Sequence, residues 1–176
     1  MLEQQRENGN ATIYQYQLIK KSHIPRPLML LYLLFPIPAL LAGTFWFSWH
    51  AVVYMPIAFF FVLWIHFVVC NSVLLIRGPI YRKKWRLRFS GVWFGFLPDQ
   101  HTGSSVIQQV LMQSLWIGFV FIGVLAAWIP LALTLALLFW HLWFMAPRIS
   151  ILLGMRGQRK DIMVKLNAQD ISYYVQ

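Results

Sequence analysis

Two histidines, His66 and His141, stand in the middle of long apolar stretches, where a polar side chain needs a bonding partner. The sequences of these two stretches are similar. Each begins with an apolar residue and proline, carries its histidine at mid-length, and ends in Ser, a β-branched residue, Leu-Leu and then Arg-Gly. This agreement predicts an internal duplication that places both histidines at one depth, whereas chance similarity between two apolar helices is the alternative.

Paired histidines on neighbouring helices support two kinds of chemistry. They can hydrogen-bond across helices, or they can ligate one haem iron from both sides. The rings of Trp64, Trp140 and Trp143 belong to the same turns and compete for the space that a porphyrin needs. We therefore expect no cofactor and an interhelical role, with haem b bound by His66 and His141 as the alternative.

Amide side chains add to this polar set. Asn71 follows His66 in the same apolar stretch, and Gln113 lies near the start of another, after Gln108 and Gln109. Polar side chains in such places usually bond across helices. We expect the intramembrane polar residues to do the same; they are His66, His141, Asn71 and Gln113.

Residue types and motifs that the sequence lacks exclude several classes of function. None of the five acidic residues falls inside an apolar stretch, which counts against proton- or cation-coupled transport and against a membrane metal site. Cys70 is the single cysteine, so neither an internal disulfide nor a cysteine-based zinc site can form. The chain also lacks a nucleophile elbow, a His-Glu-x-x-His motif and a phosphate loop. We expect a protein that is not an enzyme.

The elements that carry these residues are membrane-spanning helices. The chain is 59% hydrophobic and only 11% charged, and it has no charged residue from Pro27 to Ile76 or from Gln100 to Pro147. Since about 20 residues cross a bilayer, each uncharged block predicts a helical hairpin. We expect an all-α integral membrane fold of four helices in two parallel-repeat hairpins, near Leu28–Ser48, Tyr54–Ile76, Ile107–Leu125 and Pro130–Ile151.

The basic residues predict an orientation. All fifteen Lys and Arg residues lie before the first helix, between the hairpins or after the last helix, so they fall on one side of the membrane. The positive-inside rule then places both termini and the central loop in the cytoplasm of a multi-pass protein of the cell membrane. The expected segments are a cytoplasmic amphipathic N-terminal segment (1–27), a first transmembrane hairpin (28–76), a basic and aromatic interfacial loop (77–105), a second transmembrane hairpin (106–151) and a cytoplasmic tail (152–176).

Within the central loop, residues 79–96 alternate rings with cations. A helical template places one apolar stripe beside one cationic face, and a strand template fits the first half equally well. Both predict an amphipathic interfacial segment on anionic phospholipid, with docking of a partner protein and nucleic-acid contact as alternatives. The residues expected to bind lipid or a partner are Arg82, Lys83, Lys84, Trp85, Arg86, Arg88, Phe89 and Trp93.

These features favour a scaffold or accessory subunit of a larger membrane assembly for transport, secretion or DNA transfer. Its expected partners are anionic phospholipid and other membrane subunits or cytoplasmic proteins, in a homo- or hetero-oligomer, and nucleic acid is not expected. A small haem-binding redox subunit is one alternative. A small anion channel or exporter is another, because the inner face is basic.

Overall fold

The computed structural model describes residues 17–47, 49–155 and 162–175. Four helical segments in it are long and apolar enough to cross a membrane, as the sequence predicted. The first combines α2 (Arg26–Leu34) with α3 (Pro36–Phe47). The other three are α4 (Ala51–Arg77), α6 (Ser104–Leu125) and α7 (Leu131–Met155).

Prolines shape the first two of these helices. The chain turns at Phe35, between α2 and α3, because Pro36 has no backbone N–H to continue the helical hydrogen bonds of α2. In the expected helix Tyr54–Ile76, Pro56 falls in the first turn, where a missing backbone N–H costs little. In the structure that helix starts earlier, at Ala51, so Pro56 lies inside α4.

The expectation of an all-α fold is wrong in one respect, since the structure also contains strands. Four of them form an antiparallel sheet in the order β1-β6-β5-β4, which pairs the first strand of the described chain with its last. The cytoplasmic segments that the sequence assigned to the N-terminus and the C-terminus therefore pair with each other; residues 1–16 of the first, and residues 156–161 and 176 of the second, are outside the described residues. The strands are β1 (Gln17–His23), β4 (Thr102–Gly103), β5 (Ile162–Leu166) and β6 (Asp170–Val175).

The segment with alternating rings and cations forms a short helix and a β-hairpin. Helix α5 (Pro79–Lys83) leads into β2 (Trp85–Ser90), which pairs with β3 (Trp93–Pro98). Gly91 takes a positive φ of 63° in the tight turn between the strands, a conformation that suits glycine. The strand template was therefore right for this region, and the helical stripe was wrong beyond Lys83.

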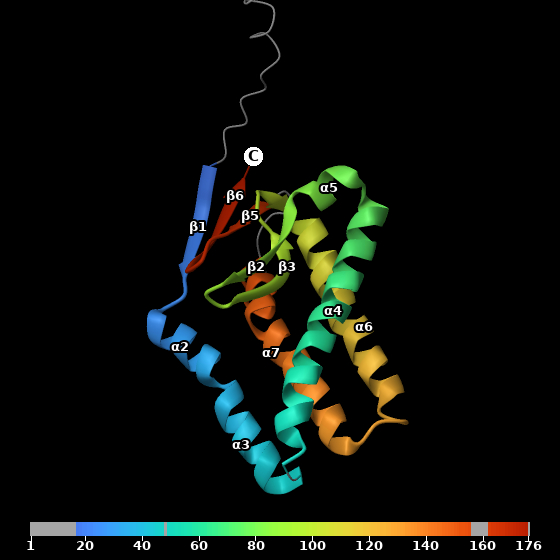
Figure 1. The fold of residues 1–176 in the computed structure, drawn as a ribbon. Helices are drawn as coiled ribbons and strands as arrows, with labels where there is room; N and C mark the ends of the chain where they lie inside the picture. The colour runs from blue at the N-terminus through green and yellow to red at the C-terminus, as the bar shows by residue number, and fades with distance from the viewer. Residues whose placement is uncertain (1–16, 48, 156–161, 176) are drawn as a thin grey trace, which may run out of the picture.

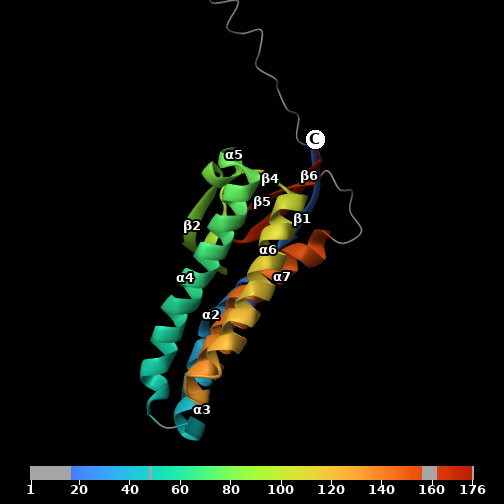
Figure 2. The ribbon, with the colours of Figure 1, turned by 90° about the vertical axis from the view of Figure 1, so that its right-hand side faces the viewer.

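All strands lie at one end of the helices, which we call the sheet end (Figure 1). The links from α3 to α4 and from α6 to α7 lie at the opposite end, the turn end (Figures 1 and 2). Both termini of the described chain and the central loop thus share one end, as expected for two helical hairpins.

The core is built mainly by α4, α6 and α7. One buried cluster lies near the sheet end and combines these helices with both sheets, and the other lies between α4 and α7 toward the turn end. By contrast, no residue of α2 or α3 is buried. The first span therefore lies at the edge of a three-helix core.

Candidate functional site

The predicted histidine pair exists, and the two rings touch. His66 Nε2 of α4 lies 2.9 Å from His141 Nδ1 of α7, and their ring planes are at 74°. Both side chains are buried. The matching depth expected from the duplication thus takes the form of a direct contact between two helices that run in the same direction.

The hydrogen bonds around the pair assign its protons. His141 Nε2 lies 3.2 Å from the carbonyl oxygen of Leu115 on α6, and a carbonyl can only accept, so this nitrogen carries a proton. In a neutral ring Nδ1 of His141 then accepts from the Nε2–H of His66. Nδ1 of His66 is left as a bare acceptor, and it has no hydrogen-bond partner among the described residues. The pair is therefore a directed chain of two neutral imidazoles that ends on the backbone of α6.

Close packing holds both rings in place. Gly118 of α6 lies against the His141 ring so closely that a Cβ at this position would overlap it. Phe119 meets the His141 ring edge-on at 4.7 Å, and Phe144 meets the His66 ring at 5.7 Å. An axial haem ligand directs its nitrogen at the iron, whereas these two nitrogens bond to each other. The contacts therefore describe an interhelical hydrogen bond, and haem ligation stays a prediction for spectroscopy.

Arg148 is the most unusual residue near this pair. The sequence analysis counted it among the basic residues that follow the last helix on the cytoplasmic side, but it lies inside α7 and is only 1% exposed. Its Nη2 donates to the carbonyl oxygen of Phe94 on β3 at 2.9 Å, while Nε and Nη1 have no partner among the described residues. Gly95 of β3 makes room for it, since a Cβ there would lie 2.7 Å from Nη2. The hairpin thus covers a buried guanidinium.

Cys70 and Ser114 complete this buried group. Cys70 Sγ lies 3.4 Å from Ser114 Oγ, between α4 and α6, and both side chains are fully buried. We call the whole set the polar core; its members are His66, Cys70, Ser114, His141 and Arg148.

The polar core brings together a permanent positive charge, two neutral imidazoles, a thiol and a hydroxyl. It contains no carboxylate, so it lacks the acid partner that a buried guanidinium usually has. Its free donors on Arg148 and its free acceptor on His66 call for water or a small anion rather than for a metal cation.

The predicted interhelical role of Asn71 and Gln113 stays a prediction. Asn71 and Gln113 are half-buried, and neither has a hydrogen bond to another described residue. Gln109 instead accepts from the Nε and Nη2 of Arg77, which ties the end of α4 to α6. The amide that joins these two helices is thus Gln109, which the sequence analysis did not include among the expected interhelical residues.

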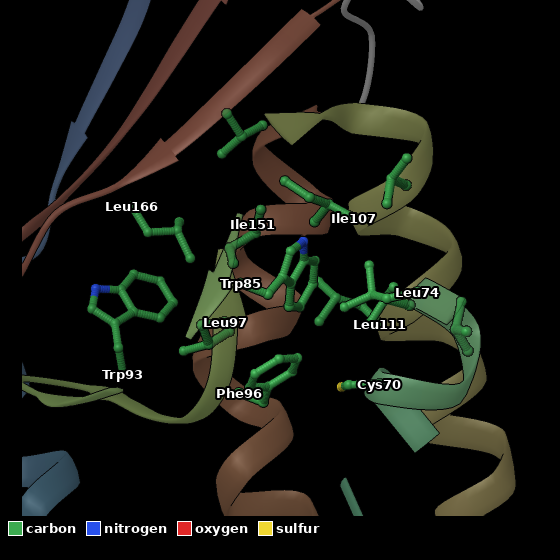
Figure 3. Close-up of a cluster of buried hydrophobic side chains, with 14 of the residues drawn as sticks. Cys70, Leu74, Trp85, Trp93, Phe96, Leu97, Ile107, Leu111, Ile151 and Leu166 are labelled. Atoms are coloured by element: carbon green, nitrogen blue, oxygen red, sulfur yellow. The ribbon is translucent and has the colours of Figure 1, made fainter. Parts of the chain in front are cut away.

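The hairpin separates the predicted lipid-binding residues into two groups. Trp85 and Trp93 are buried in the cluster near the sheet end, where Trp85 packs on Phe96 with ring centres 6.0 Å apart (Figure 3). Their expected contact with lipid or a partner is therefore wrong for the folded chain. Phe89 is 58% exposed, and its neighbour on the same face of β2, Leu87, is 49% exposed.

The predicted cations divide in a similar way. Arg82, Lys83 and Arg86 are exposed, and Lys84 is half-buried. Arg88 is also half-buried, because it donates to the carbonyl oxygen of Leu166 at 2.8 Å and so joins the hairpin to the C-terminal sheet. Arg86 and Arg88 also lie 3.8 Å and 3.9 Å from the carboxylate of Asp99. The exposed charge thus gathers on α5 and the outer edge of β2.

Sequence reasoning missed Arg148 and Ser114. A signal existed for Arg148, since Pro147 before it does not end the apolar periodicity, which continues through Ile151 and Leu152. The acceptor of Arg148 could not be predicted from the sequence, because it is the backbone carbonyl oxygen of Phe94, which every residue type would provide. Comparison of the chain with protein-family models, with curated proteins and with solved structures gives no match.

Proposed function

We propose that this chain is a non-enzymatic multi-pass membrane protein that acts as a scaffold or accessory subunit of a larger membrane assembly. The sheet end faces the cytoplasm, with both termini inside, and the hairpins α2/α3–α4 and α6–α7 are parallel repeats. Partners bind this end or pack beside the spans. The assembly serves transport, secretion or DNA transfer.

One observation carries the proposal: the sheet end has an exposed amphipathic edge. Ile80, Leu87 and Phe89 are 69%, 49% and 58% exposed beside the exposed cations of α5 and β2. Exposed rings and aliphatic side chains next to cations suit the boundary between acyl chains and anionic headgroups. This edge supports anchorage on anionic phospholipid in the inner leaflet.

A small anion channel or exporter is the second candidate function, and Arg148 is the observation that favours it. A buried guanidinium without a carboxylate in the described chain attracts anions more strongly than a paired one. Passage through the chain needs further subunits, because its three core helices pack around side chains. The same residue therefore suits an accessory subunit beside a larger pore.

The lipid anchorage can be tested with full-length protein in nanodiscs of phosphatidylcholine, with and without phosphatidylglycerol. We expect phosphatidylglycerol to raise the melting temperature of the wild type. Arg82→Gln with Arg86→Gln should lose most of that rise, since each cation near an anionic surface contributes about 1 kcal/mol. Salt should reduce the effect, because it screens exposed charges.

The matched control is Arg82→Lys with Arg86→Lys, which keeps both charges and should keep the rise. An equal response of the Gln and Lys variants would contradict the anchorage. The scaffold role needs a second measurement, chemical cross-linking in native membranes followed by mass spectrometry. We expect cross-links from lysines of the sheet end to another chain or a second copy, and a strictly monomeric product would contradict it.

A further inference from the structure

Two adjoining cavities lie between α2 and α7, with volumes of about 440 Å³ and 420 Å³. Leu28, Tyr32 and Ala146 line both of them, so together they form one groove, which we call the lateral groove. Each cavity is within the range of about 300–1,000 Å³ that is typical of ligand sites. Figure 1 shows α2 slanting away from the sheet along the outer side of α7.

The lining of the lateral groove changes along its length. Toward the turn end it is made of apolar side chains, including Leu31, Phe35 and Leu142. Toward the sheet end it includes Ser22, His23 and Ser150. A molecule that fits both halves has an apolar tail and a polar head, and its head points toward the sheet end.

The lateral groove is longer than the hydrocarbon part of one leaflet is thick. On α7 its lining runs from Phe139 to Gly154, which is about 22 Å of helix at 1.5 Å per residue. One leaflet contributes about 15 Å to the hydrocarbon core of a bilayer. The whole groove is therefore long enough for the acyl depth of one leaflet together with a headgroup at the polar half.

The groove is not closed by side-chain packing. No residue of α2 is buried, and α2 and the turn that follows it meet α7 through two stacked ring pairs, Tyr32 with Trp143 and Phe35 with Phe139. Leu28, Leu31 and Ala146 remain exposed in the described chain. Exposed apolar side chains between two membrane helices are covered by lipid.

The charge at the mouth selects the headgroup. His23 lines the polar half, Lys21 precedes it on β1, and the exposed Arg26 begins α2 two residues before Leu28. The carboxylate of Asp170 lies 3.7 Å from Lys21 and also interacts electrostatically with His23, whereas Arg26 has no ion pair among the described residues. The excess of positive charge is complementary to a phosphate with a net negative headgroup.

From these observations we infer that the lateral groove is a binding site for one anionic phospholipid. One acyl chain lies between α2 and α7, and the phosphate lies beside Ser22, His23 and Ser150. The inference rests on the proposed orientation in the membrane. It goes beyond general anchorage, because it places a single lipid in a defined site on the side of the first span.

The test uses full-length protein purified in mild detergent and incubated with phosphatidylglycerol or phosphatidylcholine. After extensive washing, the lipid that stays with each chain is measured by native mass spectrometry. We expect the wild type to keep phosphatidylglycerol in a one-to-one ratio and to lose phosphatidylcholine. Ala146→Trp fills the shared wall of the groove and should lower retained phosphatidylglycerol to the phosphatidylcholine level.

The matched control is Ala127→Trp, which adds the same side chain at an exposed position after α6, outside both cavities. It should retain lipid as the wild type does. Equal loss in both Trp variants, or equal retention of both lipids by the wild type, would overturn the site. Arg26→Gln adds a charge test at the mouth, and it should weaken retention without affecting folding.

The two proposals fail separately. Loss of the nanodisc effect in Arg82→Gln with Arg86→Gln, together with unchanged retention in Ala146→Trp, would keep the anchorage and remove the groove site. The opposite pattern would keep the groove site and remove the hairpin anchorage.

Discussion

Tyr32 and Trp143 are joined by ring stacking and by two hydrogen bonds, each from one side chain to the backbone carbonyl oxygen of the other residue. The rings are stacked with centres 4.3 Å apart and planes at 8°. The Tyr32 hydroxyl donates to the carbonyl oxygen of Trp143 at 3.0 Å, and Nε1 of Trp143 donates to the carbonyl oxygen of Tyr32 at 3.1 Å. Since α2 has no buried residue, this pair attaches α2 to α7, while α3 packs on α4 through Ala39 and Leu40.

Truncating Tyr32 in two steps should separate these contributions. Tyr32→Phe removes one interhelical hydrogen bond and should cost about 0.6 kcal/mol of unfolding free energy, a typical value within membranes. Tyr32→Ala also removes the stack and should cost about 3 kcal/mol. Chemical unfolding in detergent measures both. Tyr54→Phe is the control and should leave stability unchanged, because the Tyr54 hydroxyl has no hydrogen bond to the described residues; equal losses for Tyr32→Phe and Tyr32→Ala would contradict the stacking role.

Gly118→Ala should damage the histidine pair. The added Cβ overlaps the buried His141 ring, so the ring must move away from Leu115 or from His66. We expect a loss of about 1–3 kcal/mol in unfolding free energy, as for other overpacked cores. Gly123→Ala on the same helix meets nothing within 4 Å and should be neutral or slightly stabilising, since Ala favours helix. A neutral result for Gly118→Ala would contradict the close contact.

The absorption spectrum tests what the histidine pair binds. Because His66 Nε2 and His141 Nδ1 bond to each other, we expect protein from haem-replete cells to be colourless. His141→Gln should leave the spectrum unchanged and lower thermal stability. A Soret band that disappears in His66→Ala or His141→Ala would instead favour the redox alternative.

Asp170 should make the sheet sensitive to acid. Burial raises the pKa of its carboxyl group. Hydrogen bonds from Asn167 and Ser172 and the charge of Lys21 lower the pKa by more than burial raises it, so the pKa lies below its ordinary value. The folded state therefore prefers the carboxylate, and this stabilisation is complete above the unfolded pKa of about 4 and is lost as pH falls through the lower folded value. Thermal unfolding measured at acidic and neutral pH should show a smaller acid loss for Asp170→Asn than for the wild type. Asn167→Ala should move the loss to higher pH, and an unchanged acid response in Asp170→Asn would contradict this role.

Cysteine labelling should place the sheet end on one side of the membrane. Single cysteines at positions 100 and 169 should both react only from the cytoplasmic side, and a cysteine at position 127 should react only from outside. Cys70 is fully buried, which keeps the background low. Labelling of position 100 from outside would contradict the two hairpins.

The sequence was sufficient for the features that depend on local composition. The uncharged blocks predicted the four spans, because the bilayer requires apolar side chains over a fixed length. The similar stretches around His66 and His141 predicted their common depth, and the structure adds the direct bond. Both predictions depend only on the residues of a single helix or on the similarity between two helices.

Features that depend on distant pairing could not be predicted in this way. Strands β1 and β6 join opposite ends of the chain, and β1 has no alternation of buried and exposed residues to mark it. Trp85 and Trp93 were predicted from residue type to bind lipid or a partner, yet the pairing of β2 with β3 turns them into the core. Arg148 resembles any cation near a membrane surface until the hairpin covers it.

The pairing of β1 with β6 also sets an order of events during synthesis. Lys20 pairs with Tyr173, so β1 has no partner until a segment about 150 residues later in the chain has been made. At about 5–20 residues per second the first span spends several seconds in the membrane before its strand finds this partner. During that interval the Tyr32–Trp143 attachment also waits for α7. A stop codon just before β6 would therefore yield a chain whose first span lacks its strand pairing at the sheet end.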